Sequence, residues 1–168
     1  MDELWRHLPA PVRRSAERPD VTLILPALLI GEYPQPDDVA WLAAQHRVTA
    51  IVNLQDHEDL IAKAVDIRAL RHASQTCGVE FHHFPVPDYN PDRLLDQLDT
   101  ILTTLRALTT RGHVIYLHCN AGVNRAPTVA IAYVHIACRL PLQAACALVK
   151  ARRACGPYVQ LLERHFGK

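Results

Sequence analysis

The chain has 168 residues, of which 49% are hydrophobic and 21% are charged, and its formal net charge is +1. These values suit one globular domain with a sizeable core, and the near-zero charge gives no reason to expect a nucleic-acid partner. Because no apolar stretch reaches about 18 residues, we expect no membrane-spanning helix and no membrane partner.

The first part of the chain differs from the rest. Residues 1–20 are rich in proline and arginine, and we expect an irregular arm there, with a short helix anchored by Trp5, ahead of a single domain at residues 21–168. The arm lacks the apolar core of a secretory signal. The 5 cysteines include no Cys-x-x-Cys pair, which argues against a disulfide framework. A reducing compartment, the cytoplasm, is therefore expected.

Short apolar runs then alternate with helical patterns. The runs predict strands at residues 21–25, 28–31, 48–54, 79–84 and 113–117. The helical patterns predict helices at residues 37–45, 65–77, 92–111, 141–154 and 157–166, and one that has Pro127 in its first turn. The polar residues 55–59 are expected to form a loop near the rim of a pocket. This alternation predicts an α/β fold with a central mixed sheet flanked by helices.

The most informative segment joins the strand ending at Leu117 to the helix containing Pro127. It reads His118-Cys-Asn-Ala-Gly-Val-Asn-Arg125. Successive N–H groups in such a strand-to-helix loop can form an anion-binding nest, and the helix start adds its dipole. Gly122 leaves room for the turn, and the planar fork of Arg125 can bind two oxygens at once.

A phosphate cradle is therefore predicted from Asn120, Ala121, Gly122, Val123, Asn124 and Arg125. The same positive field favours the thiolate of Cys119, which makes this side chain the candidate nucleophile. His118 is expected to order the loop from behind. The alternative is a buried structural cysteine followed by a helix-capping arginine, but the flanking strand and the Ala-Gly pair favour the cradle.

The loop resembles the Cys-x5-Arg signature of the cysteine-dependent protein tyrosine phosphatase superfamily. The short chain is similar to the dual-specificity branch, and Cys-Asn-Ala-Gly-Val-Asn-Arg is most similar to the loop of glucan phosphatases, laforin and the plant starch phosphatases. Asn124 stands where those enzymes carry glycine. The resemblance implies a phosphatase P-loop at the carboxyl end of a central strand.

The resemblance also implies a general acid, an aspartate about thirty residues before the cysteine. Asp88 lies 31 positions upstream of Cys119, at the centre of the proline-rich run Phe84-Pro-Val-Pro-Asp88. Asp92, at 27 positions, is the alternative acid, although its sequence context favours a helix cap. Taken without the cradle, Asp88 could equally form an Asx-turn in a proline loop.

The resemblance implies a phosphomonoester hydrolase that works through a phosphocysteine and needs no cofactor and no metal. The expected substrates are a phosphoprotein, on tyrosine, serine or threonine, or a phosphorylated glucan. The alternative is a binding module that keeps the cradle and recognises phosphate with little turnover. Tyr89 and Tyr158 are candidates for the mouth of the site or for ordinary core and rim positions. Arg152 and Arg153 either attract anions or complement a helix end.

Overall fold

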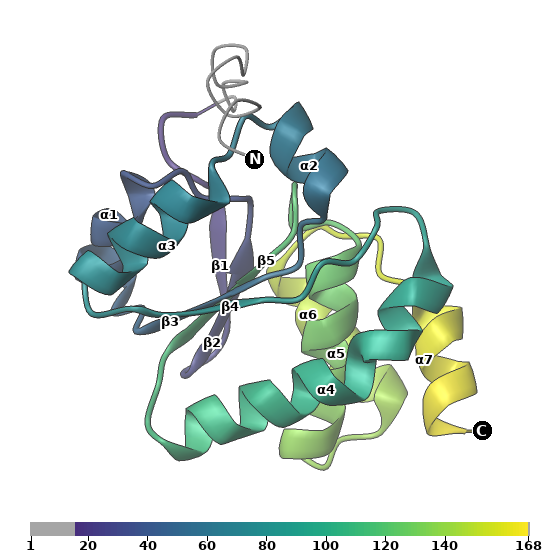
Figure 1. Cartoon of the computed structure of the whole chain (residues 1–168). Helices are drawn as coiled ribbons and strands as arrows, with labels where there is room; N and C mark the ends of the chain where they lie inside the picture. The colour runs from purple at the N-terminus through teal and green to yellow at the C-terminus, as the bar shows by residue number, and fades with distance from the viewer. Residues whose placement is uncertain (1–15, 168) are drawn as a thin grey trace.

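The computed structural model describes residues 16–167, so the short helix expected around Trp5 and the first fifteen residues of the predicted arm lie outside the described residues. A five-stranded sheet in the order β1-β2-β5-β3-β4 forms the centre (Figure 1). Its strands are β1 (Val21–Leu25), β2 (Leu28–Gly31), β3 (Ala50–Asn53), β4 (Glu80–His83) and β5 (Ile115–His118). Only β1 pairs antiparallel, so the sheet is mixed, as predicted.

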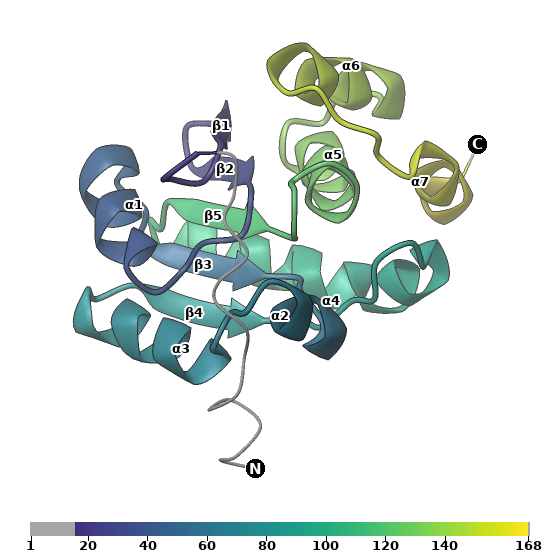
Figure 2. The ribbon, with the colours of Figure 1, turned by 90° about the horizontal axis from the view of Figure 1, so that it is seen from above.

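Helices cover both faces of this sheet. They are α1 (Asp38–His46), α2 (His57–Ala62), α3 (Ile67–Thr76), α4 (Pro91–Thr110), α5 (Arg125–Ala137), α6 (Leu142–Arg152) and α7 (Val159–Phe166). Figure 2 shows α1 and α3 on one face and α4 to α7 on the other. The predicted α/β fold is confirmed.

The period of two along each strand divides the core into two clusters. On β5, Ile115 and Leu117 join the larger cluster with α4, α5, α6 and α7, while Tyr116 joins the smaller cluster with α1 and α3. Strand β5 lies between β2 and β3 and is buried along its whole length. The segment that follows β5 therefore leaves the middle of the sheet.

Helix α4 carries the longest apolar stripe. The predicted face is confirmed for all but Leu95, which is only partly buried: the buried members are Leu94, Leu98, Ile101, Leu102, Leu105 and Leu108. The predicted cap was wrong. Asn90 caps α4, because its Oδ1 accepts a hydrogen bond from the Arg93 N–H at 3.2 Å and Pro91 occupies the first turn.

A second correction concerns residues 55–59, which were expected to form a loop. His57 begins the short helix α2, because Asp56 and Asp59 form a reciprocal capping box, with backbone-to-carboxylate distances of 2.9 and 3.0 Å. The signal was present in the sequence as Asp-x-x-Asp, but a helix of 6 residues has too little periodicity to indicate itself.

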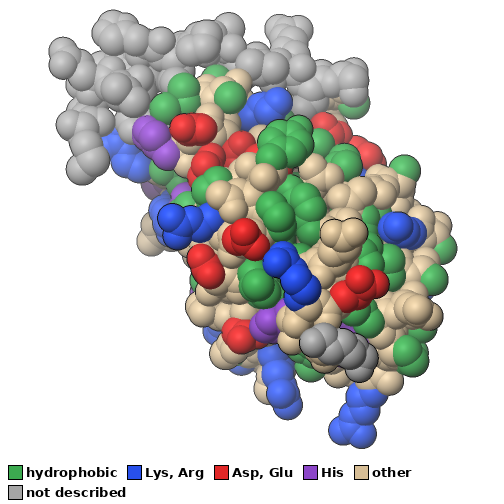
Figure 3. Space-filling view, turned by 90° about the vertical axis from the view of Figure 1, so that its right-hand side faces the viewer, with side chains coloured by type: hydrophobic (Ala, Val, Ile, Leu, Met, Phe, Trp, Pro, Cys, Tyr) green, Lys and Arg blue, Asp and Glu red, His purple; other side chains and the backbone are tan. Residues whose placement is uncertain are grey.

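Charges of both signs are interspersed on the face formed by the start of α4 and by α7 (Figure 3). On this face, Arg164 lies 3.4 Å from Asp92 and His165 lies 2.9 Å from Asp99, which joins the two helices. None of the helices in the described part of the chain is long and apolar enough to cross a membrane.

We expect Leu98→Ala to lower the free energy of unfolding by about 2–5 kcal/mol, because it empties a fully buried position between α4 and the sheet. Urea denaturation monitored by circular dichroism measures the change. Thr103→Ala, at an exposed position of the same helix, is the control and should shift the value by less than about 0.5 kcal/mol. Equal losses in both variants would contradict the assignment of this core.

Candidate active site

Residues 119–124 connect the carboxyl end of β5 to the first turn of α5. This is the edge of an open α/β sheet at which ligands bind. Cys119 directly follows the strand and is only 3% exposed, and Arg125, the first residue of α5, is 1% exposed. The structure therefore brings the two ends of the predicted cradle together at the middle of this edge.

The carbonyl groups of residues 120–123 all point outward from the loop, because each accepts a hydrogen bond from a group outside it. In chain order, the donors are the Tyr33 N–H, Arg153 Nη2, Arg153 Nε and the Gly156 N–H, at 2.9, 3.0, 2.8 and 2.8 Å. No N–H of residues 120–123 donates to any residue that the structure describes. Free N–H groups opposite bonded carbonyls are the arrangement of an anion-binding nest.

Gly122 is required by two constraints. Its φ of +67° lies in the left-handed region, where a side chain is unfavourable. A Cβ there would lie 2.7 Å from the Gly31 carbonyl carbon and oxygen and 2.8 Å from Arg153 Nη2. The loop thus approaches the end of β2 so closely that only glycine fits.

Asn124, which replaces the glycine of the glucan phosphatases, has φ −113° and ψ −70°. Since this φ is negative, a side chain at this position is tolerated. The Asn124 carbonyl accepts bonds from the Thr128 N–H at 3.1 Å and from Thr128 Oγ1 at 2.7 Å. The departure from the glucan phosphatase pattern therefore leaves the backbone of the loop intact.

The guanidinium of Arg125 has one end, Nη1, that makes hydrogen bonds, and one edge, formed by Nε and Nη2, that makes none to any residue the structure describes; this edge is called the free edge. Nη1 donates to Asp59 Oδ2 at 2.6 Å and to the carbonyls of Val86 and Leu54 at 2.7 and 3.4 Å. Nε and Nη2 are buried and have no hydrogen-bond partner among the described residues. Burial opposes the charge, but Asp59, the Cys119 sulfur and Asp88 together raise the pKa of Arg125. The free edge is a permanently charged fork of the kind that binds two phosphate oxygens.

Asp59 also belongs to the site, although it was not predicted from the sequence. Besides Arg125, this carboxylate accepts a bond from Asn120 Nδ2 at 2.7 Å, and Gln55 Nε2 in turn donates to Asn120 Oδ1 at 2.8 Å. Burial opposes ionisation of Asp59, but the bonds from Arg125 and from the Asp56 N–H outweigh it and lower the pKa. Gln55 and Asp59 therefore contact the predicted cradle, but both are buried, at 0% and 8% exposed, and do not form the exposed rim that was expected.

The two candidate acids lie in different places. Asp88 Oδ2 is 3.2 Å from Arg125 Nη2, and this side chain is 24% exposed, whereas Asp92 is 79% exposed and faces Arg164. The loop that carries Asp88 is fixed at its start, because the Val86 N–H donates to the Leu54 carbonyl at 3.1 Å. Of the two aspartates, Asp88 is therefore the one placed at the cradle.

His118, the last residue of β5, is completely buried. Its Nδ1 lies 3.0 Å from the Cys119 carbonyl oxygen, and its ring stacks on Tyr116 with the centroids 5.7 Å apart. Burial lowers the pKa of His118 to about 3, so the ring is neutral at physiological pH. A neutral imidazole can fix the start of the loop, the supporting role expected for this residue.

Arg153 has a role that neither sequence interpretation anticipated. Besides the two loop carbonyls, it contacts Thr22 Oγ1 at 2.9 Å, and it is 7% exposed. Its neighbour Arg152 donates to the Ile24 carbonyl. Both arginines therefore join α6 to β1, and Arg153 also holds the outer side of the cradle.

Tyr89 and Tyr158 differ in exposure. Tyr89 follows Asp88, is 82% exposed and has a φ of +57°, which is uncommon outside glycine. The hydroxyl of Tyr158 is buried. Within residues 16–167, no group of three or more His, Cys, Asp or Glu side chains has an arrangement that could hold a metal ion. His82 and His83 bond in different directions, to Glu80 at 2.8 Å and to the Gln55 carbonyl at 2.6 Å.

Comparison with known proteins places this site in a family. Residues 30–161 match the family model described as "Dual specificity phosphatase, catalytic domain". The chain belongs to the dual-specificity phosphatase family. The phosphoglucan phosphatase DSP4, amyloplastic, of Castanea sativa is 31% identical over 143 residues, which cover 83% of this chain and 38% of the relative. Laforin of Mus musculus is 26% identical over 123 residues, covering 67% of this chain and 37% of laforin.

This member of the family spans less than two fifths of the length of those two relatives. Among solved structures, the active form of Tk-PTP superposes with a TM-score of 0.74 at 21% identity, covering 86% of this chain and 95% of that one. PTPMT1 superposes with a TM-score of 0.73 at 17% identity, covering 86% and 93%. These two likenesses concern the fold, which is that of the phosphatases.

Gly122→Ala should weaken vanadate binding more than about tenfold, because the new Cβ meets backbone at 2.7 Å in addition to an unfavourable φ. Gly112→Ala is the matched control, since Gly112 also has a positive φ, +84°, but faces open space. Isothermal titration with vanadate measures both variants. Parent-like affinity in Gly122→Ala would show that the close approach to Gly31 does not shape the cradle.

Asp59→Asn should lower the free energy of unfolding by about 1–3 kcal/mol above pH 5, because Arg125 loses a charged hydrogen-bond partner. The folded-state pKa of Asp59 lies below its usual 3.8, so this stabilisation is complete above that value and is lost as the pH falls through the lowered pKa. The difference between parent and variant should therefore shrink below pH 4 in urea denaturation series.

Glu58→Gln, an exposed neighbour in the same turn of α2, should show neither the loss nor its pH dependence. A stability difference for Asp59→Asn that stays constant down to pH 2 would rule out the charged pair as its source.

Proposed function

We propose that this chain is an active phosphomonoester hydrolase that works through a phosphocysteine intermediate. The observation that carries the proposal is the buried Arg125, whose Nε and Nη2 make no hydrogen bond within the described residues, although Nη2 lies 3.2 Å from Asp88 Oδ2, beside a loop with four free N–H groups in sequence. Buried polar groups are normally paired. Unpaired donors gathered around one cysteine indicate a site that is completed by an anionic ligand.

In the first step, the Cys119 thiolate attacks phosphorus and the bond from phosphorus to the ester oxygen breaks. The loop N–H groups and the Arg125 fork bind the equatorial oxygens, where negative charge is held in the transition state. Protonated Asp88 gives its proton to the leaving oxygen, which departs as an alcohol or phenol. The location of Asp88 supports this role, because its carboxyl group lies at the cradle, 3.2 Å from Arg125 Nη2.

In the second step, Asp88 acts as a general base instead of a general acid. Ionised Asp88 removes a proton from water while the water oxygen attacks phosphorus, and the sulfur–phosphorus bond breaks. Inorganic phosphate leaves, and the Cys119 thiolate and protonated Asp88 are restored. The chain's own groups supply the positive field in both steps, so the proposed reaction uses no metal and no cofactor.

The proposed substrate is a phosphoprotein or a phosphorylated glucan. The names of the Castanea phosphoglucan phosphatase and of dual specificity protein phosphatase 5 of Homo sapiens, 25% identical over 133 residues, support the two classes. Two exposed side chains stand at the rim of the site. Tyr89 follows the acid and is 82% exposed, and Val123 belongs to the cradle and is 39% exposed. Release of phosphate from amylopectin, compared with phosphotyrosyl and phosphothreonyl peptides, separates the two substrate classes.

A reducing compartment suits the proposed enzyme, because oxidation of Cys119 would remove the nucleophile. All cysteines in the described part of the chain are free thiols. The cytoplasm is the proposed location, whereas the name of the Castanea relative assigns that protein to the amyloplast. Expression of a fluorescent fusion of the full chain tests this point.

Cys119→Ser should abolish hydrolysis of para-nitrophenyl phosphate while vanadate binding is retained, because the cradle survives but the nucleophile is lost.

Asp88→Asn should slow hydrolysis of an alkyl phosphate by about 10²–10⁴-fold, since a poor leaving group needs the acid. Steady-state phosphate release measures both. Cys138→Ser and Asp92→Asn, which change exposed side chains away from the cradle, are the controls.

Parent-like turnover in Cys119→Ser would exclude the phosphocysteine route. A parent chain that binds vanadate but hydrolyses no phosphomonoester would favour the binding-module alternative. A larger loss in Asp92→Asn than in Asp88→Asn would transfer the acid role to Asp92.

A further inference from the structure

Tyr158 is fixed to the cradle through its backbone. It directly precedes α7, and its N–H donates to Thr128 Oγ1 at 2.8 Å, while the same hydroxyl donates to the Asn124 carbonyl at 2.7 Å. Thr128 lies in the first turn of α5. The start of α7 is therefore held against the segment that presents Arg125, although the two are about thirty residues apart in the chain.

The side chain of Tyr158 has an unusual polar environment. The ring packs against the larger core cluster, and the hydroxyl is buried without a hydrogen-bond partner among residues 16–167. Leaving a buried hydroxyl unpaired has a cost in free energy. This cost suggests that the hydroxyl gains its partner in another state of the site.

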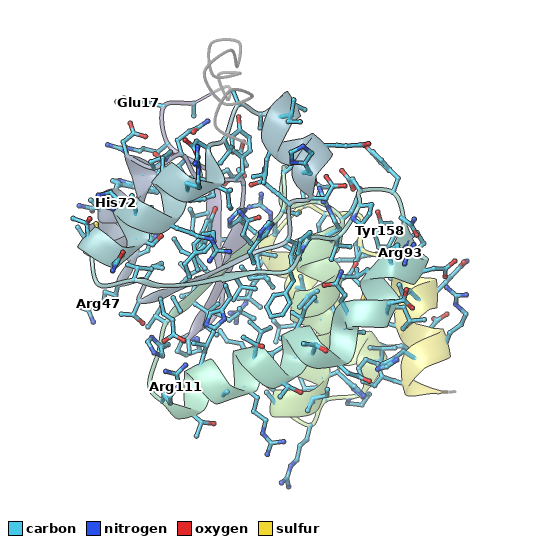
Figure 4. All side chains as sticks on the ribbon, in the orientation of Figure 1. Glu17, Arg47, His72, Arg93, Arg111 and Tyr158 are labelled. Carbon is cyan, nitrogen blue, oxygen red and sulfur yellow. The ribbon has the colours of Figure 1, made fainter. Side chains whose placement is uncertain are left out.

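Tyr158 lies next to the start of α4, which directly follows the acid loop. Figure 4 shows Tyr158 close to the start of α4, and Pro91 and Tyr158 line a common hollow of the surface. Burial, and after it the charge of Asp88, raise the pKa of Tyr158, so the phenol keeps its proton and remains a donor. The Tyr89 N–H also lies near the phenol oxygen and opposes this rise in pKa, and the same N–H donates to Asp88 Oδ1 at 3.0 Å.

The charged groups facing the hydroxyl limit what it can bond. They are Asp88, Arg125 and Cys119. A guanidinium offers no acceptor. Because Cys119 serves as the nucleophile in the proposed reaction, the Asp88 carboxyl is the acceptor that remains for the hydroxyl among these three groups.

In the present structure, Asp88 Oδ2 is taken up by Arg125 Nη2 at 3.2 Å. A phosphate group bound to the free edge of Arg125 displaces this contact, because its oxygens need the same N–H donors. Asp88 then needs a new partner.

We propose that Tyr158 is a positioning residue for Asp88. When phosphate occupies Arg125, the Tyr158 hydroxyl donates a hydrogen bond to one oxygen of the Asp88 carboxyl, so that the other oxygen, which carries the proton, faces the leaving group. Tyr158 keeps its own proton throughout, and the proton that is transferred comes from Asp88. This inference rests on the proposed function and adds a residue to it.

The test is Tyr158→Phe, which removes the hydroxyl and keeps the ring. Hydrolysis of an alkyl phosphate should slow about tenfold, a fraction of the general-acid contribution. Hydrolysis of para-nitrophenyl phosphate, whose leaving group needs a proton least, should change less than about twofold. Vanadate affinity should equal that of the parent chain and serves as the check on folding and on the cradle.

A double-mutant cycle with Asp88→Asn decides whether Tyr158 acts through the acid. Adding Tyr158→Phe to Asp88→Asn should cause no further loss on the alkyl phosphate, because the group being positioned is already absent. Tyr133→Phe is the matched control. This buried tyrosine of α5 bonds to Thr109 Oγ1 at 2.8 Å, and its loss should leave both substrates unaffected.

Losses that multiply in the double variant would overturn the inference, as would an equal slowing of both substrates, which would place the hydroxyl on the phosphoryl group itself. Unchanged rates in Tyr158→Phe would also overturn it. A parent chain without any phosphatase activity would overturn the proposed function and this inference together, so the two failures are distinguishable.

Discussion

A charged guanidinium buried at the junction of four segments is the constraint on which the site depends. Removing such an ion from water costs several kcal/mol unless charge and hydrogen bonds compensate it. For Arg125, the compensation comes from Asp59 on α2, from the Leu54 carbonyl after β3 and from the Val86 carbonyl of the acid loop. Because Nη1 makes all three of these bonds, Nε and Nη2 make no hydrogen bond within the described residues, and Nη2 has only the ion-pair contact with Asp88 at 3.2 Å. The segments that bury the Arg125 guanidinium therefore also fix its orientation.

The cradle depends on a second set of contacts that lie outside it. A loop with all its carbonyls turned one way has no internal hydrogen bonds to stabilise it, so its shape must be imposed by neighbours. Arg153 bonds two of these carbonyls, and the N–H groups of Tyr33 and Gly156 bond the others. Two separate parts of the chain, at residue 33 and at residues 153–156, therefore hold the N–H groups inward before any ligand arrives, which is the preorganisation that electrostatic catalysis requires.

Local patterns in the sequence were sufficient for the sheet, for most helices and for the loop of residues 119–125. These features depend on hydrophobic periods and on residues that are neighbours in the chain. Asp59 and Arg153 were missed because their roles depend on contacts over 66 and 31 positions, which a single sequence does not show. The spacing of Asp88 from the cysteine indicated the acid, but only the fold separates it from Asp92. Asn90 was missed as a cap because Asp92 offered an equally suitable side chain.

The two aspartates on Arg125 differ in how firmly they are held. Asp59 accepts bonds from Arg125, from Asn120 and from the Asp56 N–H, and its side chain is 10% exposed. Among the described residues, Asp88 accepts a single hydrogen bond, from the Tyr89 N–H, besides its ion pair with Arg125, and its side chain is 24% exposed. An incoming dianion must compete with one of these carboxylates, and it displaces the less firmly bound one at the smaller cost. One aspartate then remains as the fixed counter-charge of Arg125, and the other becomes available to carry a proton.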